Sequence, residues 1–224
     1  MGLLREILAE RTVRIPLDFG INENIVLFKL DNVERTHEGE VMKRNTFMTF
    51  ARLNDKKEVV ANSEFNYYNL NHEQDAEKVW QNLANQVSQL NNIANCINPG
   101  STVDPTGAFK TEEELVKALT TKVGCDKLIK AMYESFESCV KDQVGENCPP
   151  MRLKLVTGSK GPWLQLPNEA TIAEPMTQEV TKLTVTAYEV KRKNAATSTT
   201  TPAAITGDAK GTAPASNGVL GNLI

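Results

Sequence analysis

Aromatic and basic side chains recur along the strand-like stretches of this chain. Aromatic rings can stack on planar ligands, and lysine or arginine can neutralise phosphates. Tyrosine and tryptophan suit a half-exposed site, because their polar atoms tolerate water. The alternative is that the phenylalanines belong to the core and that the bases only face solvent. The candidate binding residues are Lys29, Lys43, Arg44, Phe47, Arg52, Tyr67, Tyr68, Arg152, Lys154 and Trp163.

Catalytic chemistry has little support in the sequence. There is no GxxxxGK[ST], HExxH or GxSxG motif, and two histidines, His37 and His72, are too few for most acid–base schemes. The cysteines form no CxxC pair and have no zinc-ligand spacing to a histidine. They are Cys96, Cys125, Cys139 and Cys148. We expect reduced thiols, with a disulfide or metal site as the alternative, and a non-catalytic protein without a cofactor.

The charge of the 224-residue chain is close to balance, with 25 basic and 28 acidic residues. Residues 73–147 contain 12 acids and 7 bases, a net charge of −5, whereas residues 148–193 contain 4 acids and 7 bases, a net charge of +3. A basic segment on an acidic protein is compatible with phosphate binding. The sequence contains no apolar run of about 18 residues and no secretory signal pattern. These features predict a soluble, cytoplasmic protein without a membrane segment.

The element order begins with three strands. Residues 25–30, 46–53 and 59–68 are rich in β-branched and aromatic side chains, which favour a pleated sheet. The connections at 32–45 and 54–57 are polar, and the second has Asn and Asp turn chemistry. Short connections predict an antiparallel meander.

A helical block and further strands follow. Residues 73–97 place apolar side chains at spacings of three and four, with Asn and Gln on the other face. A capping box at Thr111 and Glu114 begins a second helix that we expect Gly124 to end. A third helix is predicted at 127–144, and strands are predicted at 151–156, 163–166 and 182–190.

The two ends of the chain differ from the middle. Residues 1–14 have helical spacing and predict a short helix or arm, with a frayed terminus as the alternative. Residues 194–224 consist mostly of Ala, Thr, Ser, Gly and Pro, which predicts a disordered tail. The tail ends in an apolar tip, formed by Val219, Leu220, Leu223 and Ile224.

This order of elements predicts an α+β domain over residues 15–193. The expected fold is a five-stranded OB-like antiparallel barrel, with a helical insert at about 73–147 between strands 3 and 4. A β-sandwich with a helical insertion is the alternative. OB barrels bind extended single strands of nucleic acid across one face. The nucleobases stack on aromatic side chains, and lysine or arginine side chains neutralise the phosphates.

Three stretches carry a resemblance to a known group of proteins. LDFGINENIVLFKLDN, EFNYYNLN, and WLQLP followed by AEPM resemble phage-encoded replication-module proteins that bind single-stranded DNA. The resemblance covers residues 17–190 and implies a non-catalytic binder that coats strands in phage DNA replication or recombination, in the host cytoplasm. The layout of domain, linker and apolar tip resembles proteins of this function that recruit replication or recombination partners through the tip. Their tip is acidic, whereas residues 218–224 contain no acid.

Two functions therefore remain open at this point. The first is single-stranded DNA binding by stacking and counterion release, which salt weakens. The second is a virion structural or assembly role, as a capsid or tail component. Self-association is compatible with either function.

Overall fold

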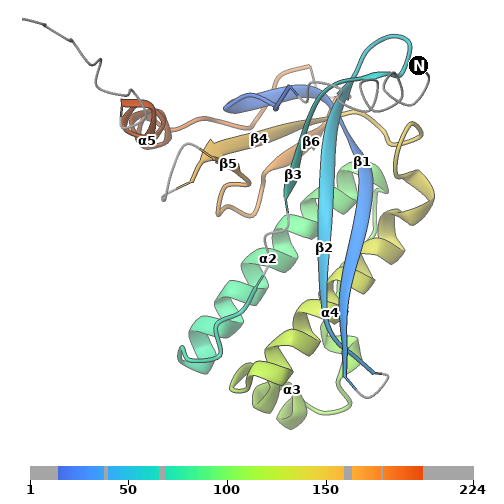
Figure 1. Cartoon of the computed structure of the whole chain (residues 1–224), viewed down its shortest axis with the longest axis vertical. Helices are drawn as coiled ribbons and strands as arrows, with labels where there is room; N and C mark the ends of the chain where they lie inside the picture. The colour runs from blue at the N-terminus through green and yellow to red at the C-terminus, as the bar shows by residue number, and fades with distance from the viewer. Residues whose placement is uncertain (1–14, 38–39, 66–68, 159–162, 178, 199–224) are drawn as a thin grey trace, which may run out of the picture.

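The computed structural model describes residues 15–37, 40–65, 69–158, 163–177 and 179–198 (Figure 1). The predicted N-terminal helix or arm lies outside the described residues. The predicted tail from residue 199 onward, including the apolar tip, also lies outside them. No helix in the described part of the chain is long and apolar enough to cross a membrane.

Three antiparallel strands confirm the predicted meander. They are β1 (Gly20–His37), β2 (Glu40–Leu53) and β3 (Val59–Phe65). β1 and β2 are longer than predicted, and most of the segment at 32–45, which we expected to be a connection, belongs to their ladder. This segment is mostly polar, so apolar periodicity did not reveal it as strand.

The turn between β2 and β3 has the predicted side-chain chemistry. Oδ1 of Asn54 accepts hydrogen bonds from the backbone N–H groups of Lys56 and Glu58, each at 2.9 Å. Lys57 has φ of 61°, the left-handed conformation that such a turn requires. The Asn side chain thus fixes the register of two neighbouring strands.

A helical block lies between the third and fourth strands. It contains α2 (Ala76–Ile97), α3 (Glu112–Leu119) and α4 (Lys122–Val140), with single-turn 3₁₀ helices at Thr106–Ala108 and Lys141–Gln143. The predicted cap of α3 is confirmed: Thr111 accepts from the N–H of Glu114, and the Glu114 carboxylate accepts from the N–H of Lys110.

The predicted role of Gly124 is wrong. Gly124 lies in the first turn of α4, and its N–H donates to the hydroxyl of Thr121, the N-cap. A Cβ atom at Gly124 would lie 2.3 Å from the backbone of Ala118 near the end of α3. The glycine is therefore needed for the close approach of two helices, rather than for ending one.

Strand β4 brings the chain back to the meander and nearly closes a barrel. β4 (Met151–Thr157) pairs antiparallel with β1. β6 (Ala173–Pro175) pairs with the first three residues of β4, and β5 (Leu164–Gln165) pairs with its last two. The sheet order is β3-β2-β1-β4-β5. The fold is thus the predicted α+β arrangement, an OB-like antiparallel barrel with α2, α3 and α4 between strands 3 and 4.

The strand predicted at 182–190 is wrong. The end of this segment begins α5 (Ala187–Ser198), and the residues before it are irregular. Thr186 accepts from the N–H of Glu189, and the Glu189 carboxylate accepts from the N–H of Thr186. This reciprocal capping box outweighs the apolar alternation. It also places residues 194–198, which were predicted to be disordered, in a helix.

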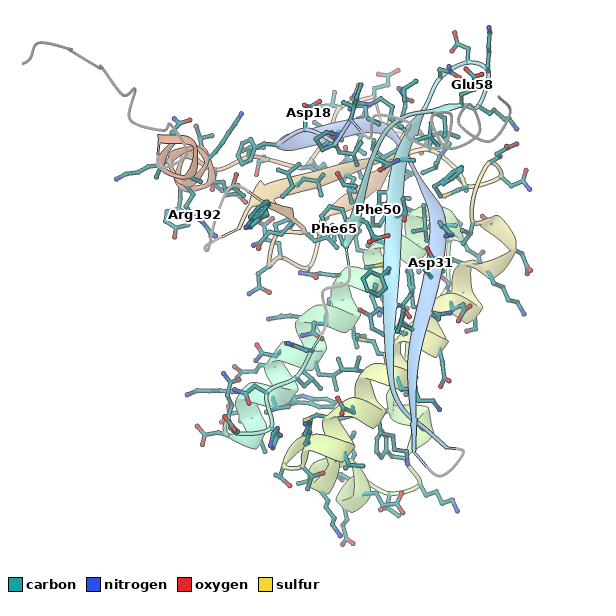
Figure 2. All side chains as sticks on the ribbon, viewed as in Figure 1. Asp18, Asp31, Phe50, Glu58, Phe65 and Arg192 are labelled. Atoms are coloured by element: carbon teal, nitrogen blue, oxygen red, sulfur yellow. The ribbon has the colours of Figure 1, made fainter. Side chains whose placement is uncertain are left out.

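The helical insert shares one hydrophobic core with the barrel. Phe50 of β2 is fully buried and packs against Phe65 of β3, with ring centroids 6.0 Å apart (Figure 2). Met132 and Phe136 of α4 are also fully buried, and α4 contacts β2. The insert covers one face of the meander and leaves the far end of the barrel for α5.

Candidate nucleic-acid interface

The barrel is open along a seam between β3 and β5. β3 pairs with β2, β5 pairs with β4, and no ladder joins β3 to β5 among the described residues. A groove of about 430 Å³ lies at this seam. Its lining residues are Pro16, Asn62, Ser63, Glu64, Phe65, Trp163 and Leu164. We call this the seam groove.

The chain just before β1 covers part of the free edge of β3. The backbone N–H of Asn62 donates to the carbonyl of Ile15 at 2.9 Å, and the N–H of Leu17 donates to Oγ of Ser63 at 3.0 Å. An uncovered strand edge invites pairing with another chain, so this contact protects β3. It also makes Pro16 one wall of the seam groove.

Trp163 is the aromatic side chain of the seam groove that is free to stack. Its side chain is 73% exposed, whereas Phe65, in the same groove, is 3% exposed and belongs to the core. The carbonyl of Trp163 accepts from the N–H of Gly158 at 2.8 Å, which ties its backbone to the end of β4. The indole therefore stands in water on a fixed backbone, as a stacking platform requires.

Helix α5 places basic side chains at the same end of β4. Lys191 and Lys193 are exposed, and the guanidinium of Arg192 lies 5.9 Å from the ring centroid of the exposed Tyr188. Lys193 also lies over the ring of Phe19, at 5.0 Å. The sequence does not place these bases among the candidates, because it predicts a strand for the segment before them. A Thr-x-x-Glu capping box at Thr186 and Glu189, followed by three consecutive basic residues, is the sequence pattern that indicates a basic helix here.

Arg152 does not face solvent as its alternation along β4 suggested. Its side chain is buried, and it forms ion pairs with Glu23 at 2.8 Å and with Glu174 at 3.2 Å. The hydrogen bond to Glu23 is the main reason why the pKa of Arg152 is raised. The pKa of Glu174 is lowered: burial opposes this, but hydrogen bonds from Thr181, Lys182 and Arg152 outweigh it.

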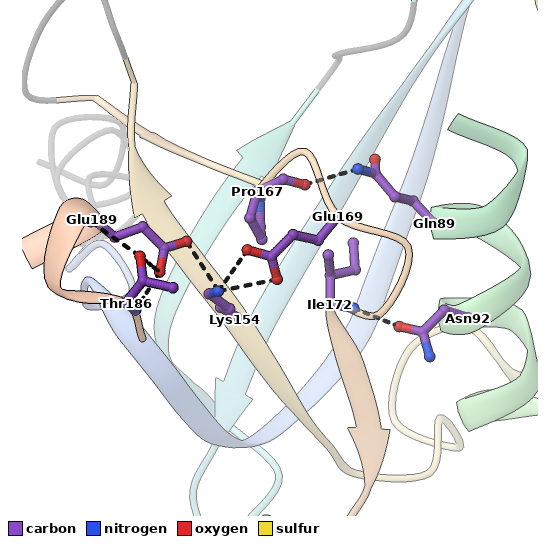
Figure 3. A network of polar contacts seen from close by, with 8 residues as sticks. All are labelled: Gln89, Asn92, Lys154, Pro167, Glu169, Ile172, Thr186 and Glu189. Carbon is purple, nitrogen blue, oxygen red and sulfur yellow. Dashed lines mark hydrogen bonds and ion pairs between the residues drawn. The ribbon is translucent and has the colours of Figure 1, made fainter. Parts of the chain in front are cut away.

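Lys154 is buried more deeply and is also paired. Its side chain is 2% exposed, and Nζ lies 2.9 Å from both Glu169 and Glu189 (Figure 3). Burial opposes the charged form, but the hydrogen bonds to the two carboxylates prevail and raise the pKa of Lys154. The placement of Arg152 and Lys154 on a phosphate-binding face is thus corrected. Both faces of β4 are buried, and its two charged side chains therefore form ion pairs inside the protein.

The other predicted residues have different surroundings. Lys29 is exposed and pairs with Asp31 at 2.7 Å, Arg52 is half-buried and donates to Oδ1 of Asn22 at 3.2 Å, and Phe47 is half-buried. Lys43 and Arg44 lie on β2, and at these two positions the structure describes only the backbone. Tyr67 and Tyr68 lie outside the described residues. Of the six candidates whose side chains the structure describes, only Trp163 lines the seam groove.

The four cysteines are free thiols in the structure. Burial raises the pKa of Cys96 to about 12 and that of Cys148 to about 11. The Cys148 sulfur accepts a hydrogen bond from the N–H of Leu27 at 3.2 Å. Such protonated, buried thiols are poor nucleophiles and poor metal ligands. No cluster of possible metal ligands occurs among the residues that the structure describes.

Comparison of the chain with protein families, with curated proteins and with solved structures finds no match in any of the three.

Proposed function

We propose that this chain is a non-catalytic single-stranded DNA-binding protein that holds the strand along the seam groove. The observation that carries the proposal is the exposed indole of Trp163 at the open seam of an OB-like barrel. Every base has a π-face, so stacking on an indole gives binding that tolerates different sequences. A phage protein that coats single strands during DNA replication or recombination must bind them whatever their sequence.

The charges near the seam groove support the same ligand. Arg152 and Lys154 are held in ion pairs inside the protein, but α5, which carries Lys191, Arg192 and Lys193, packs against β4, and the last residues of β4 pair with β5 next to Trp163. The Lys154–Glu189 ion pair holds α5 against that strand. A strand whose base stacks on Trp163 would have its phosphates within the field of α5.

Partner recruitment through the tip at Val219, Leu220, Leu223 and Ile224 is a separate part of the proposal. Its support is the sequence layout alone, because the tip lies outside the described residues. The proposal places the protein in the host cytoplasm, where replication proteins would meet it.

Fluorescence anisotropy of a labelled oligo-dT tests the proposed function. We expect binding that weakens as salt rises and that exceeds binding to a duplex of the same length, because duplex bases cannot stack on the indole. Equal affinity for single strand and duplex would exclude a stacking groove. The absence of binding at low salt would exclude the function, and co-purification with phage particles would then test a virion role.

A further inference from the structure

The far half of the β1–β2 hairpin extends beyond the barrel as a two-stranded arm (Figure 1). β4 pairs with β1 only as far as Ile25, and β3 pairs with β2 only at residues 48–53. The ladder between β1 and β2, however, continues to the pair formed by His37 and Glu40. We call residues 29–37 of β1 the arm strand. One of its two edges is paired with β2, and the other is its outer edge.

The outer edge of the arm strand is unpaired. Just before it, the chain around Gly145 covers β1: the N–H of Gly145 donates to the carbonyl of Leu27 at 2.9 Å, and the N–H of Leu27 donates to the sulfur of Cys148 at 3.2 Å. From Lys29 onward, no described segment forms a backbone hydrogen bond with this edge. A row of unpaired N–H and C=O groups is a template for a further strand.

The arm strand is supported on one face and exposed on the other. Helix α4 contacts β2 below the arm, and Nδ2 of Asn32 lies 3.4 Å from Oε1 of Glu137 on that helix. Neighbouring residues of a strand point to opposite faces. On the face opposite Asn32, Val33 is 52% exposed, and the side chains of Lys29 and Asp31 are 61% and 40% exposed. The edge is therefore held in an extended conformation and remains accessible to a partner.

The arm strand, with the sequence KLDNVERTH, is complementary to itself in antiparallel pairing. A two-fold axis perpendicular to the sheet keeps each residue on the same face in both copies, so it must pass through one residue that faces its own copy. With the axis at Val33, Asp31 of each copy lies opposite Arg35 of the other. Lys29 lies opposite His37, which carries no formal charge at pH 7. Opposite charges directly across a strand pair are stabilising.

Other two-fold axes along this strand bring like charges together. An axis at position 32 places Lys29 opposite Arg35, and axes at positions 31, 34 and 35 place a charged residue opposite itself. Like charges directly opposite each other are destabilising. Charge alone therefore selects the register in which the exposed, apolar Val33 lies at the centre.

The ladder inside one chain gives a second reason for a carboxylate at this position. Arg35 lies directly opposite Lys43 of β2. Two basic residues in such a pair repel each other. A second copy that pairs about Val33 brings its Asp31 beside this basic pair, so dimer formation reduces the repulsion.

We propose that the outer edge of the arm strand is a homodimer interface, in which two copies of this chain pair their β1 strands antiparallel about Val33. The inference does not depend on the proposed function, because it concerns the protein free of DNA. Pairing of one edge buries a small area compared with a permanent dimer interface. The dimer is therefore reversible, and its fraction rises with protein concentration.

Sedimentation velocity of the full-length, DNA-free protein over a range of concentrations tests the proposal. We expect a monomer–dimer equilibrium in the unmodified protein. Val33→Lys places two ammonium groups opposite each other at the axis, so it should weaken the dimer by about fivefold or more. Val116→Lys is the matched control, because Val116 is 51% exposed on α3, away from the arm, and its substitution should leave the equilibrium unchanged.

An exchange of charges tests the register itself. Asp31→Arg and Arg35→Asp each place like charges opposite each other in a dimer of identical chains, so each variant alone should be mainly monomeric. An equimolar mixture of the two should dimerise again, because each variant supplies the charge that the other requires. Circular dichroism of each variant checks that the fold is retained.

Three outcomes would overturn the proposal. The first is an unmodified protein that stays monomeric at every concentration; a loss of oligo-dT affinity in Arg35→Asp would then assign the arm to DNA. The second is equal dimerisation of Val33→Lys and Val116→Lys, which would place the interface on another surface. The third is a mixture of folded Asp31→Arg and Arg35→Asp chains that remains monomeric, because the register about Val33 requires the mixed dimer to form.

Discussion

Nζ of Lys154, on β4, lies 2.9 Å from Oε1 of Glu189, on α5. The lysine side chain is 2% exposed and that of the glutamate 12% exposed. A buried ammonium is unfavourable unless carboxylates surround it. This pair therefore fixes where α5 docks, and with it the position of the basic residues that follow Glu189 in the helix.

Glu189→Gln should destabilise the fold by about 1–3 kcal/mol, because a buried ammonium would lose one of its two carboxylates. Glu169→Gln is the matched comparison: it removes the other carboxylate, whose side chain is 46% exposed, so its effect should be smaller. Urea unfolding followed by circular dichroism measures both. Equal effects would show that burial of Glu189 does not strengthen the pair.

This ion pair and the Arg152–Glu174 pair, also on β4, predict how stability depends on pH. The pKa values of Glu174 and Glu189 are lowered in the fold, so their stabilisation is present above the unfolded glutamate pKa, about 4.3, and is lost as pH falls through the lower folded values. The pKa of Lys154 is raised, so its stabilisation is lost only as pH rises through a value above about 10.4.

We therefore expect a stability plateau between about pH 5 and pH 10, with an acid decline below it. The double variant Glu174→Gln/Glu189→Gln should be less stable on the plateau and should show a shallower acid decline. Unfolding free energies between pH 2.5 and 7 measure this. An unchanged acid decline in the double variant would mean that other carboxylates control acid unfolding.

The sequence predicted the meander, α2 and the cap of α3 because their signals are local. Apolar periodicity and the side chains of Asn54 and Thr111 act within a few residues. The surroundings of β4, by contrast, are formed by residues far away in the sequence. Arg152 and Lys154 alternate with leucines, as on a solvated strand, and only segments more than ten residues away supply Glu169, Glu174 and Glu189.

The candidate site was predictable only in part. Trp163 could be proposed from its residue type, because an indole beside a short strand suits a half-exposed position. The groove between α2 and the segment after β5 could not be predicted, since the Asn and Gln residues of α2 have the pattern of an ordinary polar helix face. Their meaning depends on the segment after β5, which packs against that face through Gln89 and Asn92.

Trp163→Ala should weaken binding to oligo-dT by about 5- to 150-fold, the loss that corresponds to about 1–3 kcal/mol for one stacked base. Trp80→Ala is the control, because this tryptophan is 41% exposed on α2 and does not line the seam groove. Anisotropy titrations at one salt concentration compare the two. Similar losses in both variants would remove Trp163 as the platform.

The two tryptophans also allow a direct optical measurement of stacking. In Trp80→Phe the single remaining indole is Trp163, since the chain contains two tryptophans. Stacking of a base on an indole should quench its fluorescence, so saturating oligo-dT should reduce the emission of this variant. Binding without any quenching would place the DNA elsewhere on the protein.

Lys191→Ala/Lys193→Ala should weaken oligo-dT binding and change its salt dependence. Each lost phosphate contact reduces the slope of log affinity against log salt by about 0.7 for a single strand, so two contacts give about 1.4. Lys56→Ala/Lys57→Ala removes the same charge from the exposed β2–β3 turn. If α5 contacts phosphates, its double variant alone lowers the slope, because a general charge effect would change both variants equally. Equal slopes in the two double variants would mean that α5 is only a structural cover for β4.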